Sequence, residues 1–174
     1  TSLMLGGLLA AAGFVAAALA RNADTPLAFV PAGVLVAFGV TAASLPYGTL
    51  ILSEAPAEFY GPVTSARTTF GQLFYSLGTA LSTVAVTQLT ISGITARLHA
   101  AGMSASDVAS ALGSVGAYAK DGTRPAPQVF EAATAAYRDG FGVLMTAIAV
   151  LAAIVALIGA RLIARGGRSG TAAG

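Results

Sequence analysis

Formal charge is absent from four long segments of this chain. The nine basic and seven acidic residues fall only within 21–24, 54–67, 97–139 and 161–168. They make up 9% of the residues, whereas an average soluble domain has roughly 25%. A water-soluble surface needs charged side chains along the whole sequence, so this distribution predicts an integral membrane protein.

The uncharged segments are long enough to cross a membrane. A helix needs about 20 mostly apolar residues to span a hydrocarbon core of roughly 30 Å. The segments that meet this requirement are 3–20, 27–52, 70–96 and 141–163. Each is expected to be a helix, because a lone strand cannot pair its backbone polar groups in lipid. The sequence therefore predicts an all-α membrane protein with four transmembrane helices.

The connections between the predicted spans differ in length. Residues 21–26 form a turn so short that the first two spans must be antiparallel neighbours. The second connection, 53–67, then lies on the opposite side of the membrane from the first. The third, 97–140, is the only sizeable aqueous segment, and a short tail, 164–174, follows the last span.

Helix signals also occur inside the segment 97–140. Ser104 or Ser106 is suited to cap a first helix, and a second helix is expected to follow Pro127. Residues 122–127, between them, have the glycine and prolines of a turn.

Basic residues determine the expected orientation. Arg161, Arg165 and Arg168 follow the last span closely, whereas the basic residues of 97–140 are spread through a segment long enough to cross regardless of charge. We therefore expect the C-terminal tail and residues 53–67 in the cytoplasm, and residues 97–140 outside. The expected location is the cell membrane (inner or plasma membrane), crossed several times.

Polar side chains are distributed unevenly among the spans. Spans one and four are apolar on every side, which is typical of helices at the lipid-facing periphery. At about 100° per residue, one amide and five hydroxyls of span three fall in a single stripe. This polar stripe consists of Gln72, Ser76, Thr79, Thr83, Thr87 and Thr90. Two interpretations stay open: hydroxyls that join neighbouring helices, at about 0.6 kcal/mol each, or the lining of a partly hydrated pathway.

A second face of span three carries small residues. Gly71, Gly78 and Ser82 lie there, and Gly78-x-x-x-Ser82 has the spacing that lets two helices approach closely. In span two, Pro46 precedes Tyr47 and is expected to bend the helix, because its ring removes a hydrogen-bond donor. The bend is either purely structural or part of a broken segment at a substrate path.

The start of the chain and its lack of cysteine also bear on its class. Thr1 lies inside an apolar run with no preceding Met or basic leader, so we expect a piece of a longer membrane protein. Without cysteine there is neither a disulfide nor a thiolate metal site, and the redox compartment stays open.

Residues 53–66 read Ser-Glu-Ala-Pro-Ala-Glu-Phe-Tyr-Gly-Pro-Val-Thr-Ser-Ala, and Gln72-Leu73, Ser76-Leu77-Gly78 and Ala80 follow. This order resembles the major facilitator superfamily, in its fourteen-helix drug:proton antiporter branch. There, a cytoplasmic loop with Pro, Glu and Gly leads into a helix that opens on a Gln-Leu-Gly-Gly-Ser-Leu-Gly-like motif. A long external loop and one apolar helix then complete the chain. This sequence departs from the pattern at Gly71, where a basic residue is common, and at Phe74-Tyr75, which replace the two glycines.

The resemblance implies that the chain is the last four of fourteen helices in a major-facilitator-type bundle. Its partners would be the lipid bilayer, the remaining helices of the parent chain, a small organic substrate, and protons carried by the rest of the transporter. The implied function is proton-coupled export of small amphipathic or cationic molecules. Substrate would contact the polar stripe and the aromatic rings of Tyr47 and Tyr75, which can attract a cation.

Other chemistry has little support in the sequence. No carboxylate lies inside a predicted span, so the proton carriers are expected on other helices. We find no phosphate-binding loop, no paired carboxylates and no metal-ligand cluster, and we expect no enzyme, cofactor, metal or nucleic-acid partner. The alternative function is a self-contained four-helix membrane protein that assembles or anchors a partner through residues 97–140.

Overall fold

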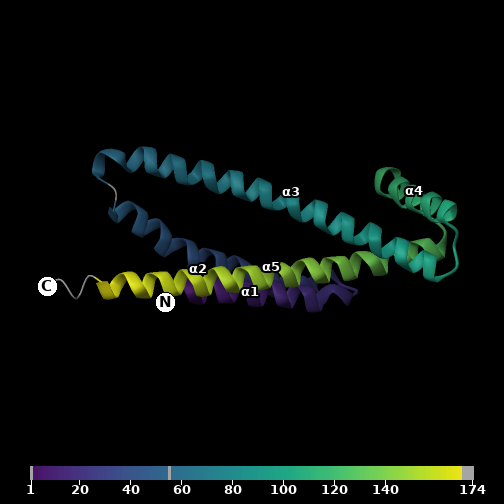
Figure 1. The fold of residues 1–174 in the computed structure, drawn as a ribbon, viewed down its shortest axis with the longest axis horizontal. Coiled ribbons are helices and arrows are strands. Elements are labelled where there is room, and N and C mark those ends of the chain that lie inside the picture. Colours follow the sequence, from purple (N-terminus) through teal and green to yellow (C-terminus); the bar gives the residue numbers. More distant parts are fainter. Residues whose placement is uncertain (1, 55, 170–174) are drawn as a thin grey trace. The chain divides into compact units, whose positions relative to one another are not determined.

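The computed structural model describes residues 2–54 and 56–169, with side chains placed except at 46–52, 54 and 163–169. The described part is 91% helical and contains no strand. Five helices follow one another along the chain (Figure 1): α1 (Ser2–Leu19), α2 (Val30–Glu54), α3 (Tyr60–Ala100), α4 (Ala105–Asp121) and α5 (Pro127–Ser169). Short 3-10 turns at Ala20–Asn22, Pro26–Phe29 and Ala57–Phe59 connect the first three.

Four helical segments are long and apolar enough to cross a membrane. They are Ser2–Asn22, Pro26–Leu45, Ala57–Ala100 and Pro127–Leu162. The prediction of an all-helical chain with four helices of this kind is confirmed.

Two of these helices begin well before the predicted spans. α3 starts at Tyr60, although the third span was expected from residue 70, and α5 starts at Pro127 rather than near 141. Proline explains why the helices can begin there: Pro62 lies in the first turn of α3 and Pro127 is the first residue of α5. In the first turn the missing N–H has no helical partner to lose, and the fixed φ of proline suits the helix.

Helix α4 forms where the capping signals predicted it. The Ser104 hydroxyl accepts a hydrogen bond of 3.3 Å from the Asp107 backbone N–H, as an N-cap residue does. At the other end Gly122 adopts a left-handed conformation, with φ of 78°, and its N–H bonds to the Tyr118 carbonyl. Of the two caps considered, the structure selects Ser104.

Two compact units make up the structure. The first contains residues up to 76 together with those from 145 onward, and the second contains residues 77–144.

Glycines bring the backbones of α1 and α2 into contact in the first unit. A Cβ added to Gly39 would lie 2.3 Å from the backbone nitrogen of Ala10, and one added to Gly6 would lie 2.5 Å from that of Ala43. No side chain fits at these distances, so only glycine permits this approach. Because the side chains here are small, the two helix backbones contact each other directly, with no bulky apolar side chains between them.

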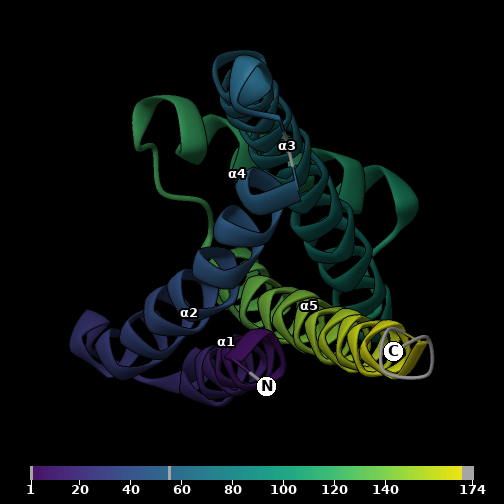
Figure 2. The ribbon, with the colours of Figure 1, turned by 90° about the vertical axis from the view of Figure 1, so that its left-hand side faces the viewer.

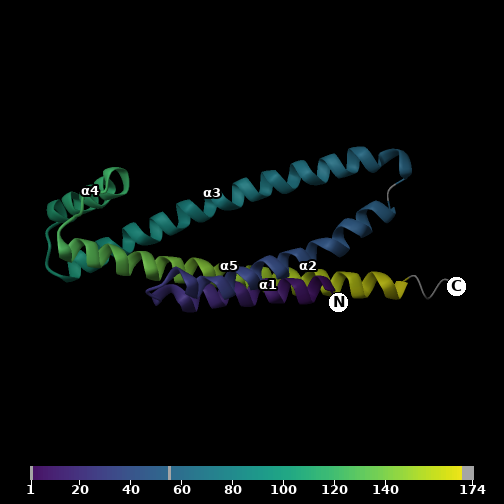
Figure 3. The same cartoon turned by 180° about the vertical axis from the view of Figure 1, so that it is seen from behind.

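A neighbouring face of α1 meets the C-terminal half of α5. A Cβ on Gly7 would lie 2.5 Å from the Cβ of Ala156, and one on Gly159 would lie 3.2 Å from a Leu3 methyl group. Figures 2 and 3 show α1 beside both α2 and this part of α5. α1 therefore buries a row of small residues against two helices: Gly6, Ala10, Ala11, Gly13, Ala17 and Ala18. Span one was expected at the lipid-facing periphery because it is apolar on every side, and its contacts with these two helices were not predicted.

A hydrophobic core holds the second unit together. It joins the end of α3, the helix α4 and the start of α5, through Ile94, Leu98, Val108, Ala111, Val129 and Ala136. Ile94 and Ala136 are only 1% exposed. Gly93 makes room for Ala136, since a Cβ on Gly93 would lie 2.9 Å from the Ala136 Cβ. The segment 97–140 is thus folded and mostly helical.

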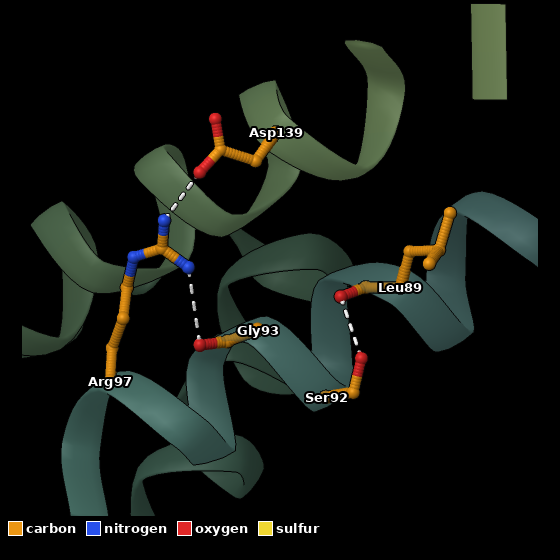
Figure 4. A network of polar contacts seen from close by, with 5 residues as sticks. All are labelled: Leu89, Ser92, Gly93, Arg97 and Asp139. Carbon is orange, nitrogen blue, oxygen red and sulfur yellow. Dashed lines mark hydrogen bonds and ion pairs between the residues drawn. The ribbon is translucent and has the colours of Figure 1, made fainter. Parts of the chain in front are cut away.

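An ion pair joins α3 to α5 beside this core (Figure 4). Nη2 of Arg97 donates to Oδ2 of Asp139 at 2.5 Å, and Nη1 donates to the Gly93 carbonyl at 3.3 Å. The two side chains are 38% and 54% exposed. At such exposure an ion pair contributes about 0–1 kcal/mol, so the hydrophobic core and not the charge holds these helices together.

We predict that Gly39→Ala destabilises the first unit. The new methyl group would collide with the α1 backbone, at a cost of about 1–3 kcal/mol in the free energy of unfolding. Gly33→Ala is the matched control, because a Cβ there meets no atom within 4 Å. It should leave stability unchanged or raise it by about 0.5–1 kcal/mol. Reversible unfolding in mixed micelles, followed by far-ultraviolet circular dichroism, measures both variants; equal stabilities would refute the backbone contact.

We also predict weak coupling between Arg97 and Asp139. A double-mutant cycle with Arg97→Gln and Asp139→Asn should give a coupling energy of at most about 1 kcal/mol. It should shrink further at high salt, because exposed charges are screened. A coupling several times larger and insensitive to salt would show that the pair lies in a medium of low dielectric constant.

Candidate functional site: the polar stripe of α3

The polar stripe lies on one continuous helix. α3 has 41 residues, so the regular rotation of about 100° per residue keeps all six stripe residues on one side. Gln72, Ser76, Thr79, Thr83 and Thr87 are exposed, and Thr90 is half-buried. A helix that is apolar enough to cross a membrane therefore presents a line of amide and hydroxyl groups on its surface.

Hydroxyls of the stripe donate to the backbone of their own helix. The Thr83 hydroxyl donates to the Thr79 carbonyl at 2.9 Å, and the Thr90 hydroxyl donates to the Val86 carbonyl at 2.7 Å. Each of these oxygens keeps acceptor capacity. The stripe is therefore suited to accept hydrogen bonds from water or from a ligand that donates them.

Two glycines of the predicted packing face of α3 have open space beside them. A Cβ added to Gly71 or to Gly78 would find no atom within 4 Å, and Ser82 is half-buried. Both glycines have open space where a second helix would fit. Their role in close packing stays a prediction.

The aromatic and proline residues considered for the pathway are placed only in part. Tyr75 is 73% exposed on α3. α2 continues unbroken as a helix through Pro46 to Glu54, so Pro46 does not end it. The side chains of Pro46 and Tyr47 lie outside the described residues, and the expected contact of Tyr47 with substrate remains untested.

A groove of about 540 Å³ lies in the first unit, between α1, α2 and α5. Its lining includes Gly7, Gly39 and Ala156, and Ser44 is its single hydroxyl-bearing residue. The Ser44 hydroxyl donates to the Thr41 carbonyl at 3.0 Å. This groove is consequently apolar and offers little for recognition of a polar group.

A second groove, of about 320 Å³, lies in the second unit and contains the outer end of the stripe. Thr87 and Thr90 line it together with Tyr137 of α5 and with Val115 and Gly116 of α4. Sequence reasoning missed Tyr137 and the α4 residues, because they reach the stripe only through tertiary folding. Residues 105–121 have an amphipathic helical pattern, and the apolar face of such a helix needs an apolar surface to pack on. This pattern was the indication in the sequence that the helix would pack on a neighbour.

Titratable groups are few near the stripe. The search for clusters of three or more His, Cys, Asp or Glu finds none among the described residues. Nδ1 of His99 lies 3.3 Å from the Met103 carbonyl, at the end of α3. In the turn after α4, hydrogen bonds from the side chain and backbone of Thr123 hold the pKa of the Asp121 carboxyl below its ordinary value.

Comparison with protein-family models, with curated proteins and with solved structures finds no match to this chain. The geometry of α3 and of its surroundings is therefore the basis for a functional assignment.

Proposed function

We propose that the chain is part of a proton-coupled efflux transporter of the major facilitator type, which exports small amphipathic or cationic organic molecules across the cell membrane. The observation that carries the proposal is the polar stripe, exposed on a helix long and apolar enough to span a bilayer. The order of motifs in residues 53–80 supports the same family.

The energetics of polar groups in lipid favour a pathway. Transfer of an amide or hydroxyl from water to hydrocarbon without a hydrogen bond costs roughly 2–7 kcal/mol. Back-bonding lowers this cost for Thr83 and Thr90, whose hydrogens are already used. The Gln72 amide has two donors and an acceptor on an exposed side chain, so it needs a polar environment. Water and a passing substrate would supply one.

Other parts of the proposal concern the parent protein. No acidic residue lies between Arg67 and Arg97 or between Phe141 and Arg161, so proton-carrying carboxylates would belong to other helices. The tail and residues 53–67 would be cytoplasmic, and residues 97–140 would lie outside. Tyr75 could then hold a cationic substrate through its exposed ring.

One observation favours the alternative of an anchoring protein. The segment 97–140 has a folded core with α3, as a docking domain would. That alternative predicts that the 174-residue segment, expressed alone, forms a monodisperse and stable protein. The transporter proposal expects it to aggregate unless the other helices are present.

We predict that Thr83→Val lowers export by roughly fivefold, the loss expected for one hydrogen bond of about 1 kcal/mol. Valine keeps the shape of threonine and removes only the hydroxyl. Gln72→Leu should lower export at least as much. The measurement is efflux of a fluorescent substrate from cells, divided by the amount of transporter in the membrane.

Thr95→Val is the matched control for this experiment. Its hydroxyl donates to the Ile91 carbonyl at 2.9 Å, as that of Thr83 does to Thr79, but it lies about 120° around α3 from Thr83, outside the stripe. Export should be unchanged in Thr95→Val. If Thr83→Val and Gln72→Leu also export normally, the stripe serves packing and the transport pathway lies elsewhere.

A further inference from the structure

Helix α4 folds back along the end of α3. Val108 and Ala111 of α4 pack on Ile94 and Leu98, and residues further along α4 face Thr90 across the groove of about 320 Å³. α4 is not among the helices long and apolar enough to cross a membrane, and it carries Asp107, Lys120 and Asp121. A helix of this composition requires water or the membrane interface. The part of α3 that it covers therefore lies at the edge of the hydrocarbon or beyond it.

Charge along α3 and α5 indicates the same boundary. A Cβ on Gly140 would lie 3.1 Å from the Cβ of Leu89, so the two helices meet at this level. Toward the start of α3, about 20 residues separate Leu89 from the next charged residue, Arg67. Toward the end of α5, about the same number separate Gly140 from Arg161. At 1.5 Å per residue each stretch measures roughly 30 Å, the thickness of a hydrocarbon core. The groove is thus at the boundary between lipid and water.

The lining of this groove carries no formal charge. Its ten residues are Val86, Thr87, Thr90, Ile91, Ile94, Leu112, Val115, Gly116, Ala119 and Tyr137. Three of them bear hydroxyls, and that of Thr90 already donates to Val86, so its oxygen is an acceptor. The volume of about 320 Å³ is at the lower end of the range of ligand pockets, roughly 300–1,000 Å³.

We propose that this groove binds a small, uncharged, amphipathic molecule, with an apolar body against the aliphatic side chains and a hydrogen-bond donor toward the threonines. A cation is disfavoured, because no carboxylate among the lining residues would compensate its desolvation. The assignment rests on the proposed function in one respect: the ligand is taken as the exported molecule, since Thr87 and Thr90 belong to both groove and stripe.

Gly116→Leu tests the site by filling the groove. A Cβ at Gly116 meets no atom within 4 Å, so the side chain enters the groove without displacing the backbone. Gly113→Leu is the matched control: the same change on the same helix, equally free of contacts, at an exposed position outside the lining. The probe is N-phenyl-1-naphthylamine, an uncharged fluorophore. Its saturable binding to the chain in nanodiscs, with the other helices of the parent protein present, is measured after subtraction of empty nanodiscs.

We expect Gly116→Leu to weaken saturable binding at least about tenfold, the effect of losing about 1.4 kcal/mol, and Gly113→Leu to change it less than about twofold. Tetraphenylphosphonium should not compete. If circular dichroism shows that Gly116→Leu has lost helix content, Ala119→Leu, which also lines the groove, replaces it.

Several results would overturn the proposal: no saturable binding to the unchanged chain, unchanged binding in the groove-filling variant, equal loss in both glycine variants, or equal affinity for the cation. Export is measured separately in the parent protein. Normal probe binding without any export would reject the transport function and leave the binding site intact.

Discussion

Contact between helix backbones is the interaction on which the first unit depends. Lipid tails are as apolar as leucine, so burial of apolar side chains gives no driving force between helices inside a bilayer. Dispersion forces and close fit remain, and both are strongest where side chains are small. Gly6 and Gly39 bring α1 and α2 together in this way, and Gly7 and Ala156 do so for α1 and α5. Larger residues at these positions would separate the helices and leave voids.

The second unit is held together by a different force. Its core contains isoleucine, leucine and valine from three helices, closed by Ala136. Such a core is stabilised by removing apolar surface from water, at about 25 cal/mol per Å², and that gain is lost in hydrocarbon. The first unit packs through small residues, which suits helices surrounded by lipid. The second unit packs through bulky aliphatic residues, which suits a core surrounded by water.

The elements that could be predicted from the sequence are those fixed by local chemistry. The long helices follow from segregated charge, and α4 follows from Ser104 and Gly122, whose capping needs only neighbouring residues. The extents of α3 and α5 could not be predicted from span length, because a helix need not end where the membrane does. The packing of α1 was missed because its buried residues differ from its exposed ones in size and hardly in polarity. Thr87 and Thr90 were placed on the stripe, but their meeting with Tyr137 depends on α5 packing against the end of α3.

Hydrogen-bond accounting along α3 restricts what the stripe can recognise. Thr83 and Thr90 use their hydroxyl hydrogens on backbone carbonyls and keep oxygen lone pairs, so they act as acceptors toward any ligand. A substrate that offers only acceptors would leave its own acceptors and the threonine oxygens without a hydrogen bond, at a desolvation cost of about 1–3 kcal/mol for each buried group. A substrate with a hydroxyl, amide or amine donor avoids this cost. The exposed Gln72 amide can also donate, and it lies about three helical turns from the Thr83 hydroxyl, or roughly 16 Å. A small molecule cannot contact both at once, so under the proposed function a substrate would meet Gln72 and Thr83 one after the other.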